Sequence, residues 1–239
     1  WHAHEMLWGF IATIALAFLM TAGANWTGIN PMSGKLLALA CVLWAVARIG
    51  FLLPWETAFW IAMTSELAFF LLGSSAMLRA VVMSKNSRNY AVPGLLAGLG
   101  AMDALYLLTA RGGDYLLLMQ RFNAGLVVMA LIALLIGRRV IPFFAMRAVH
   151  ELSLPKQTET GWVQLGACAV GVLGLLLGQP MPTAFGLGLA GVLAIVHIVS
   201  WKPWAVRSNA LLWILYVGYA GVGIGLMLAA WAQVGLALP

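Results

Sequence analysis

The chain has 239 residues, of which 63% are hydrophobic and only 8% are charged, and its mean hydropathy is +0.97. Soluble domains carry about 25% charged residues, so a water-soluble fold is excluded and a lipid bilayer is expected to cover the surface. The net charge of +6 does not indicate nucleic-acid binding, because no run of Lys and Arg is interleaved with aromatic residues and basic loops beside a membrane explain the excess.

Eight apolar runs are long enough to cross a bilayer, which requires about 20 mostly apolar residues. Continuous runs of this kind, rather than alternating segments of about ten residues, exclude a transmembrane β-barrel. The sequence therefore predicts an all-α fold, a polytopic transmembrane helix bundle. The predicted spans are residues 4–24, 36–53, 58–82, 90–110, 114–136, 161–178, 184–201 and 209–231.

The two ends of the chain indicate a piece of a longer membrane protein. The sequence begins at Trp1 without an initiator Met and ends in the apolar residues 234–239. We expect residues 1–239 to form a single transmembrane helical domain that is truncated at both ends.

The basic residues divide unequally between the two sides that eight spans define. One side receives ten of the 13 Lys and Arg residues, and the other receives only Arg48, Arg111 and Arg121. Cytoplasmic loops carry the excess of basic residues, so we expect the first side to be cytoplasmic. The His2/His4 end is then periplasmic in a bacterial cytoplasmic (inner) membrane, and the long loop 137–160 is cytoplasmic. Pro142 in that loop is compatible with the start of a short interfacial helix.

The first five spans each bring an ionisable group to the periplasmic half of the membrane. Intramembrane charges are costly and usually face the bundle interior, where opposite charges pair. Pairs such as Arg48 with Glu66, or Arg121 with Asp103, would neutralise one another. These pairs either only hold the bundle together or line a polar cavity that serves a metal, a haem or a proton path. The groups are His4 with Glu5, then Arg48, Glu66, Asp103 and Arg121.

The first ten residues, WHAHEMLWGF, hold two of the four histidines of the chain. Residues two apart on a helix do not share a face, so His2 and His4 bind one metal only if the chain around Ala3 is not helical. Glu5 is placed to orient a ligating imidazole through its second nitrogen. Two histidines and a carboxylate suit copper, zinc or non-haem iron, and a histidine also suits haem.

His197 lies near the cytoplasmic end of its span, on the order of 25 Å from His4 along the membrane normal. If both histidines bind metal, they therefore belong to two sites. Tyr216 in the next span is at a depth from which it can approach His197. The alternative is that His197 is a hydrogen-bonding residue inside the packed bundle.

The opening decapeptide, followed by TAGANWTG at residues 21–28, resembles the NnrS family, whose hallmark is a His-x-His-Glu-Met start and an Asn-Trp-Thr-Gly close around one span. Residues 137–144, GRRVIPFF, are similar to the Gly-Arg-x-Ile-Pro-Phe-Phe loop of that family. His197 with Trp201, and then residues 211–219, are similar to its late spans, although Tyr216 stands where the family is expected to have His.

The resemblance implies a protein of about twelve spans that contains haem and copper and is tied to bacterial tolerance of nitric oxide. It makes His2, His4 and His197 metal candidates. Glu5, Arg48, Glu66, Asp103, Arg121 and Tyr216 are then candidates for the surrounding shell or cavity.

The leading hypothesis is an NnrS-type haem- or metal-binding membrane protein of the nitric oxide response, with nitric oxide or a derived metal–nitrosyl species as partner. No reaction is assigned. A secondary transporter with a periplasm-facing polar cavity and a purely structural membrane subunit are the alternatives. Proton-coupled flux would favour the former, and tolerance of His2 and His4 replacement would favour the latter.

Overall fold

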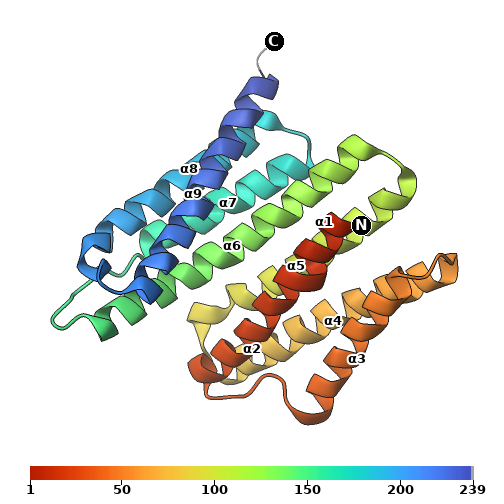
Figure 1. The fold of residues 1–239 in the computed structure, drawn as a ribbon, viewed down its shortest axis with the longest axis horizontal. Coiled ribbons are helices and arrows are strands. Elements are labelled where there is room, and N and C mark those ends of the chain that lie inside the picture. Colours follow the sequence, from red (N-terminus) through yellow and green to blue (C-terminus); the bar gives the residue numbers. More distant parts are fainter. Residues whose placement is uncertain (238–239) are drawn as a thin grey trace. The chain divides into compact units, whose positions relative to one another are not determined.

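The computed structural model describes residues 1–237, of which no segment is a strand, and the molecule is 85% helical (Figure 1). Within these residues, eight helices are long and apolar enough to cross a membrane. Transmembrane segments form helices because a lipid-exposed backbone must satisfy its own hydrogen bonds. The predicted all-α, multi-pass class is confirmed, and each predicted span coincides with one of the eight helices.

The helical elements follow one another along the chain, and most predicted spans differ from them only at the boundaries. They are α1 His2–His4, the π-helix η1 Glu5–Ala12, α2 Thr13–Thr27, α3 Gly34–Phe51, α4 Glu56–Met83, the 3₁₀-helix η2 Ser87–Asn89, α5 Ala91–Gly112, α6 Tyr115–Ala148, α7 Glu159–Leu176, α8 Pro180–Ser200, the 3₁₀-helix η3 Pro203–Val206 and α9 Ala210–Ala237.

The predicted loop 137–160 is wrong over its first half, because α6 continues through Pro142 to Ala148. Proline is favoured at the first position of a helix, so Pro142 predicted a helix start, whereas inside a helix it removes one backbone donor and usually kinks or ends the helix. In α6 the helix instead runs on past the proline, and the Val149 N–H still donates to the Ala145 carbonyl at 3.0 Å. No separate interfacial helix occurs there, and the connection to α7 is limited to residues 149–158.

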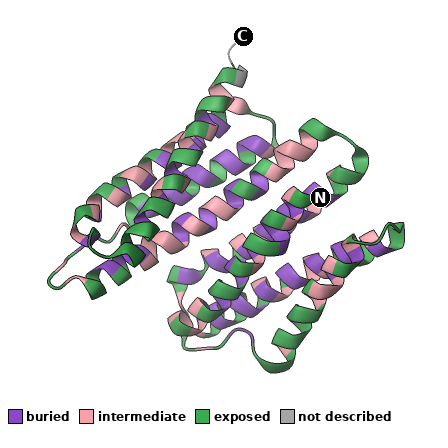
Figure 2. Ribbon diagram, in the orientation of Figure 1, coloured by how far each residue is buried: buried purple, intermediate pink, exposed green. Residues whose placement is uncertain are grey.

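The chain divides into two compact units, residues 1–125 and residues from Leu126 onward, with the division inside α6. In the first unit α4 is central, because α2, α3 and α5 all pack on it. In the second unit α8 takes this place between α7 and α9. Figure 2 shows buried residues alternating with exposed ones along these helices. Large apolar side chains such as Leu71, Leu116 and Leu211 are exposed, as expected of surfaces that face lipid.

The first span is one helical run, from His2 through η1 to Thr27, with a defined end. Gly28 has φ +70°, a left-handed conformation that glycine adopts without strain, and its N–H donates to the Ala24 carbonyl at 2.9 Å. Thr27 Oγ1 accepts a hydrogen bond from the Ile29 N–H at 3.2 Å. The Asn-Trp-Thr-Gly motif is therefore the C-terminal cap of this span.

Gly50 lies where α3 packs closely against α4, and its substitution tests this packing. A Cβ at Gly50 would lie 2.9 Å from Ala62 Cβ and 3.0 Å from the Ala58 carbonyl oxygen, both on α4. We expect Gly50→Val to destabilise the protein by about 1–3 kcal/mol through overpacking, measured by thermal unfolding in detergent. The control is Gly94→Val, because a Cβ at this helical glycine meets no atom within 4 Å. Equal stability of the two variants would contradict the predicted helix contact.

Candidate metal centre

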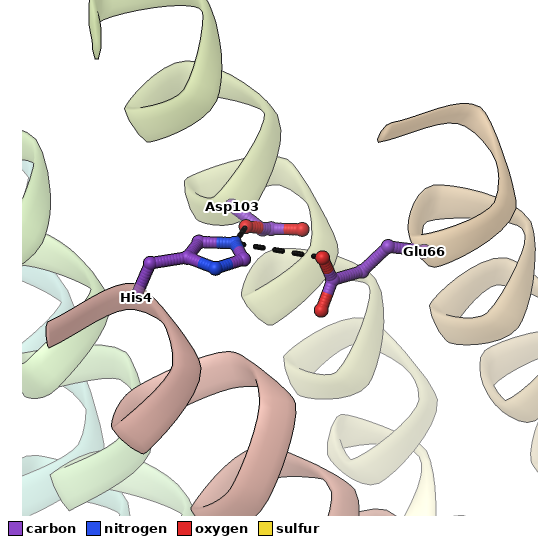
Figure 3. Close-up of side chains that lie close together, drawn as sticks. All are labelled: His4, Glu66 and Asp103. Atoms are coloured by element: carbon purple, nitrogen blue, oxygen red, sulfur yellow. Dashed lines mark hydrogen bonds and ion pairs between the residues drawn. The ribbon is translucent and has the colours of Figure 1, made fainter. Parts of the chain in front are cut away.

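Three buried side chains from three helices of the first unit converge on one point (Figure 3). His4 comes from α1, Glu66 from the middle of α4 and Asp103 from α5. His4 Nε2 lies 2.9 Å from Asp103 Oδ1, a hydrogen bond in which the imidazole N–H donates, and 3.5 Å from Glu66 Oε2. One ligand atom from each residue lies within 4.8 Å of the other two.

His4 is positioned through the residues that follow it, which are hydrogen-bonded to neighbouring helices. The π-helix η1 begins directly after His4, and π-helical turns occur frequently at functional sites. Within η1, the Trp8 indole N–H donates to the Leu99 carbonyl of α5 at 3.1 Å. The Trp44 indole N–H of α3 donates to the Gly9 carbonyl at 3.0 Å. The beginning of the first span is therefore anchored on two neighbouring helices.

Arg48 of α3 connects two carboxylates to this group. Its guanidinium pairs with Glu5 Oε2 at 2.5 Å and with Glu66 Oε1. The second oxygen of Glu5 lies 3.5 Å from His4 Nδ1. A Cβ at Gly9 would overlap both Arg48 and Glu5, so the absence of a side chain at Gly9 makes room for this ion pair.

The cluster holds more acidic than basic groups, with three carboxylates around one guanidinium and one imidazole. With all three carboxylates ionised and the imidazole neutral, as metal ligation requires, its formal charge would be −2. Buried charge without compensation is strongly unfavourable inside a membrane protein. Glu66 Oε2 and Asp103 Oδ2 are buried and make no hydrogen bond within residues 1–237. A divalent cation held by His4, Glu66 and Asp103 would bring the formal charge to zero.

The separations of the two carboxylate oxygens from His4 Nε2 suit ligands of a single cation. Ligands about 2.0–2.2 Å from one metal lie about 3.0–3.4 Å from each other in tetrahedral or octahedral coordination. The observed separations from His4 Nε2, 2.9 Å to Asp103 and 3.5 Å to Glu66, are close to this range. One imidazole and two carboxylates suit zinc, ferrous iron, manganese or copper(II), whereas copper(I) prefers sulfur ligands.

Comparison with known protein families identifies the family of this chain. A family model described as "NnrS protein" matches residues 1–239, the whole chain. The chain belongs to the NnrS family. No curated protein and no solved structure matches it. The resemblance to the NnrS family that the sequence motifs indicated is confirmed. Membership of this family is consistent with a metal or haem cofactor.

The surroundings of His4 in this NnrS chain do not fit a haem. The cavity that His4 lines has a volume of about 220 Å³, whereas pockets for drug-sized ligands measure about 300–1,000 Å³. His4 Nε2, the nitrogen that a haem iron would require, faces Asp103 and Glu66. A larger cavity of about 660 Å³ lies in the same unit, but its lining contains no histidine.

His2 does not join the group of His4, Glu66 and Asp103. The helix α1 already begins at His2, so His2 and His4 lie on different faces, and the His2 side chain is exposed. The predicted Arg48–Glu66 pair is present. For Asp103 the structure shows His4 as the partner, where the sequence analysis suggested Arg121. Glu66 and Asp103 were predicted to line a cavity. In the structure they lie close enough to His4 for all three side chains to ligate one metal ion.

His197 of the second unit is surrounded by neutral hydrogen-bonding groups. Its Nε2 lies 3.0 Å from Thr160 Oγ1 and its Nδ1 lies 3.4 Å from the Tyr219 hydroxyl, whose O–H donates to Gln164 Oε1 at 3.1 Å. The Thr160 hydroxyl in turn donates to Gln157 Oε1 at 2.9 Å, so both hydroxyl oxygens face His197 as acceptors and the imidazole N–H donates to one of them. This arrangement agrees with a hydrogen-bonding role, and His197 is in no group of three metal-ligating side chains among the described residues.

The prediction that Tyr216 approaches His197 is corrected by one helical turn. The Tyr216 hydroxyl donates to the Trp201 carbonyl at 3.0 Å, and Tyr219 makes the contact with His197. Residues three apart share a face of α9, so the sequence identified the correct face and depth alone selected the wrong tyrosine.

The buried ion pairs of Arg48 should dominate the stability of the first unit. Side-chain exposure is 14% for Arg48 and 2% for Glu66. We expect Arg48→Met to destabilise the folded protein by about 3–5 kcal/mol, because removal of one partner leaves buried carboxylates uncompensated. The measurement is thermal or denaturant unfolding in detergent.

Arg111→Met is the matched control for this substitution. Arg111 pairs with Glu56 at 2.8 Å, but these side chains are 38% and 69% exposed. An exposed pair contributes about 0–1 kcal/mol, so this variant should unfold almost as the parent does. A loss for Arg48→Met no larger than that for Arg111→Met would show that the cluster does not depend on its guanidinium.

Proposed function

We propose that this NnrS-family chain is a metal-binding membrane protein of the nitric oxide response that lowers nitrosative stress. The observation that supports this function is the buried group of His4, Glu66 and Asp103. The family resemblance supplies the link to nitric oxide. In this proposal the protein lies in a bacterial cytoplasmic membrane, with the metal centre toward the periplasm.

The residues of the cluster have distinct roles in this proposal. His4, Glu66 and Asp103 hold the cation, which supplies a centre that can bind a small ligand such as nitric oxide. Arg48 holds one oxygen of Glu66 and thereby directs the other oxygen toward His4. Glu5 faces the second imidazole nitrogen, the usual position of a group that orients a ligating histidine. Copper(II), which the family resemblance suggests, is compatible with this donor set.

Metal content of the purified full-length protein tests the assignment of the ligands. We expect His4→Ala to lower the bound metal at least about tenfold, because loss of a ligand is more severe than loss of a supporting group, which already costs about 10–100-fold in affinity. Elemental analysis and electron paramagnetic resonance give the measurement. His2→Ala and His197→Ala are the controls and should keep the metal. Equal metal content in His4→Ala and the parent would overturn the site.

Protection of cells tests the link to nitric oxide. In a strain that lacks the gene, we expect the parent protein to restore growth in the presence of a nitric oxide donor and the Asp103→Asn variant to fail, at equal amounts in the membrane. Asp103→Asn keeps the shape of the side chain and removes the charged ligand. Protection by a variant with both His2 and His4 replaced by Ala would instead favour the structural-subunit alternative.

One observation favours the transporter alternative: Glu66 lies inside its span and contacts both Arg48 and His4. Buried carboxylates of this kind form proton paths in transporters. Proton-coupled flux in proteoliposomes that is lost in Glu66→Gln, in protein free of bound metal, would support transport over metal binding. Absence of flux together with bound metal would support the metal centre.

A further inference from the structure

The cavity that His4 lines has mostly apolar walls, in contrast to the charged group of His4, Glu66 and Asp103. It measures about 220 Å³ and lies at the end of the first unit where α1, α4 and α6 begin and α3 and α5 end. Aromatic side chains form much of its lining, and no charged side chain among the described residues lines it. The aromatic members are Trp1, Phe51, Phe59 and Tyr106. We call this space the aromatic chamber.

His4 lines the aromatic chamber and is also a member of the group formed with Glu66 and Asp103. Its ring stacks with Trp1, at 5.3 Å and 26°, and with Tyr106, at 5.7 Å and 18°, and makes a T-shaped contact with Phe51 at 5.2 Å. The carboxylates of Glu66 and Asp103 do not line the chamber. A molecule in the chamber therefore contacts the imidazole and the aromatic rings.

The size and polarity of the aromatic chamber restrict what it can admit. An apolar cavity of about 150 Å³ in another protein binds benzene or xenon, and drug-sized ligands need about 300 Å³ or more. Apolar walls disfavour hydrated ions of either sign, because an ion would lose its water without gaining a partner. A small molecule without charge does not meet this barrier.

We propose that the aromatic chamber binds small uncharged molecules of weak polarity, up to about the size of benzene, against the His4 imidazole. This inference goes beyond the proposed function and depends only on the chamber. The alternative occupant is a cation, which aromatic faces also attract.

Xenon, bromide and rubidium distinguish these occupants in crystals of the full-length protein. Xenon is a neutral probe, and all three elements are located by anomalous scattering. We expect a xenon peak between Trp1, Phe51 and Tyr106, and no bromide or rubidium peak there. A rubidium or bromide peak in the aromatic chamber, or no xenon peak, would overturn the proposal.

Two exposed alanines of α5 provide a matched pair of variants. Ala110 lines the aromatic chamber, whereas Ala101, nine residues earlier, lies on the opposite face of the helix and does not line it. Ala110→Trp should remove the xenon peak and keep the metal, and Ala101→Trp should keep both. Xenon that persists in Ala110→Trp contradicts the proposal. Metal absent with xenon bound would refute the proposed function alone, and metal bound without xenon would refute this inference alone.

Discussion

The double ion pair of Arg48 with Glu5 and Glu66 is the interaction on which the first unit depends. Its three members, Glu5, Arg48 and Glu66, come from η1, α3 and α4, so a single guanidinium fixes the mutual position of three helical segments. Arginine is suited to this role because it stays charged and its planar fork of donors matches two carboxylates. The pair has room because Gly9 has no side chain, and one face of the guanidinium lies 5.5 Å from the Phe51 ring. The geometry of the group of His4, Glu66 and Asp103 therefore depends on the position of the Arg48 guanidinium.

Glu5 and Glu66 each use their two carboxylate oxygens in the same way. One oxygen binds Arg48, and the other faces a nitrogen of His4, which for Glu5 is Nδ1 and for Glu66 is Nε2. The imidazole thus lies beside a carboxylate at each nitrogen, is hydrogen-bonded to Asp103 through Nε2, and stacks with the rings of Trp1 and Tyr106. A ligand held in this way needs little reorganisation to bind a cation, which is what a functional site on rigid elements requires.

Composition and hydropathy were sufficient to predict the eight spans, and counting residues along each span placed Arg48 and Glu66 at depths where they could pair. Depth does not give the direction in which a side chain points around its helix, so the contact of His4 with Asp103 and the choice between Tyr216 and Tyr219 could not be predicted. Local rules also failed where tertiary context prevailed. Pro142 predicted a helix start, yet α6 continues through it, and the π-helix η1 has no clear sequence signature.

The two buried histidines show why the number of histidines is a poor guide to metal sites in a membrane protein. His4 faces three carboxylates, so a cation near it is stabilised by opposite charge. His197 faces hydroxyl groups, and the Arg138 guanidinium lies against Gly161, next to Thr160, so the nearby charge is positive and disfavours a second cation. The same side chain is a candidate metal ligand in one setting and a hydrogen-bonding core residue in the other. In lipid, where screening is weak, the charge of the neighbours decides between these roles.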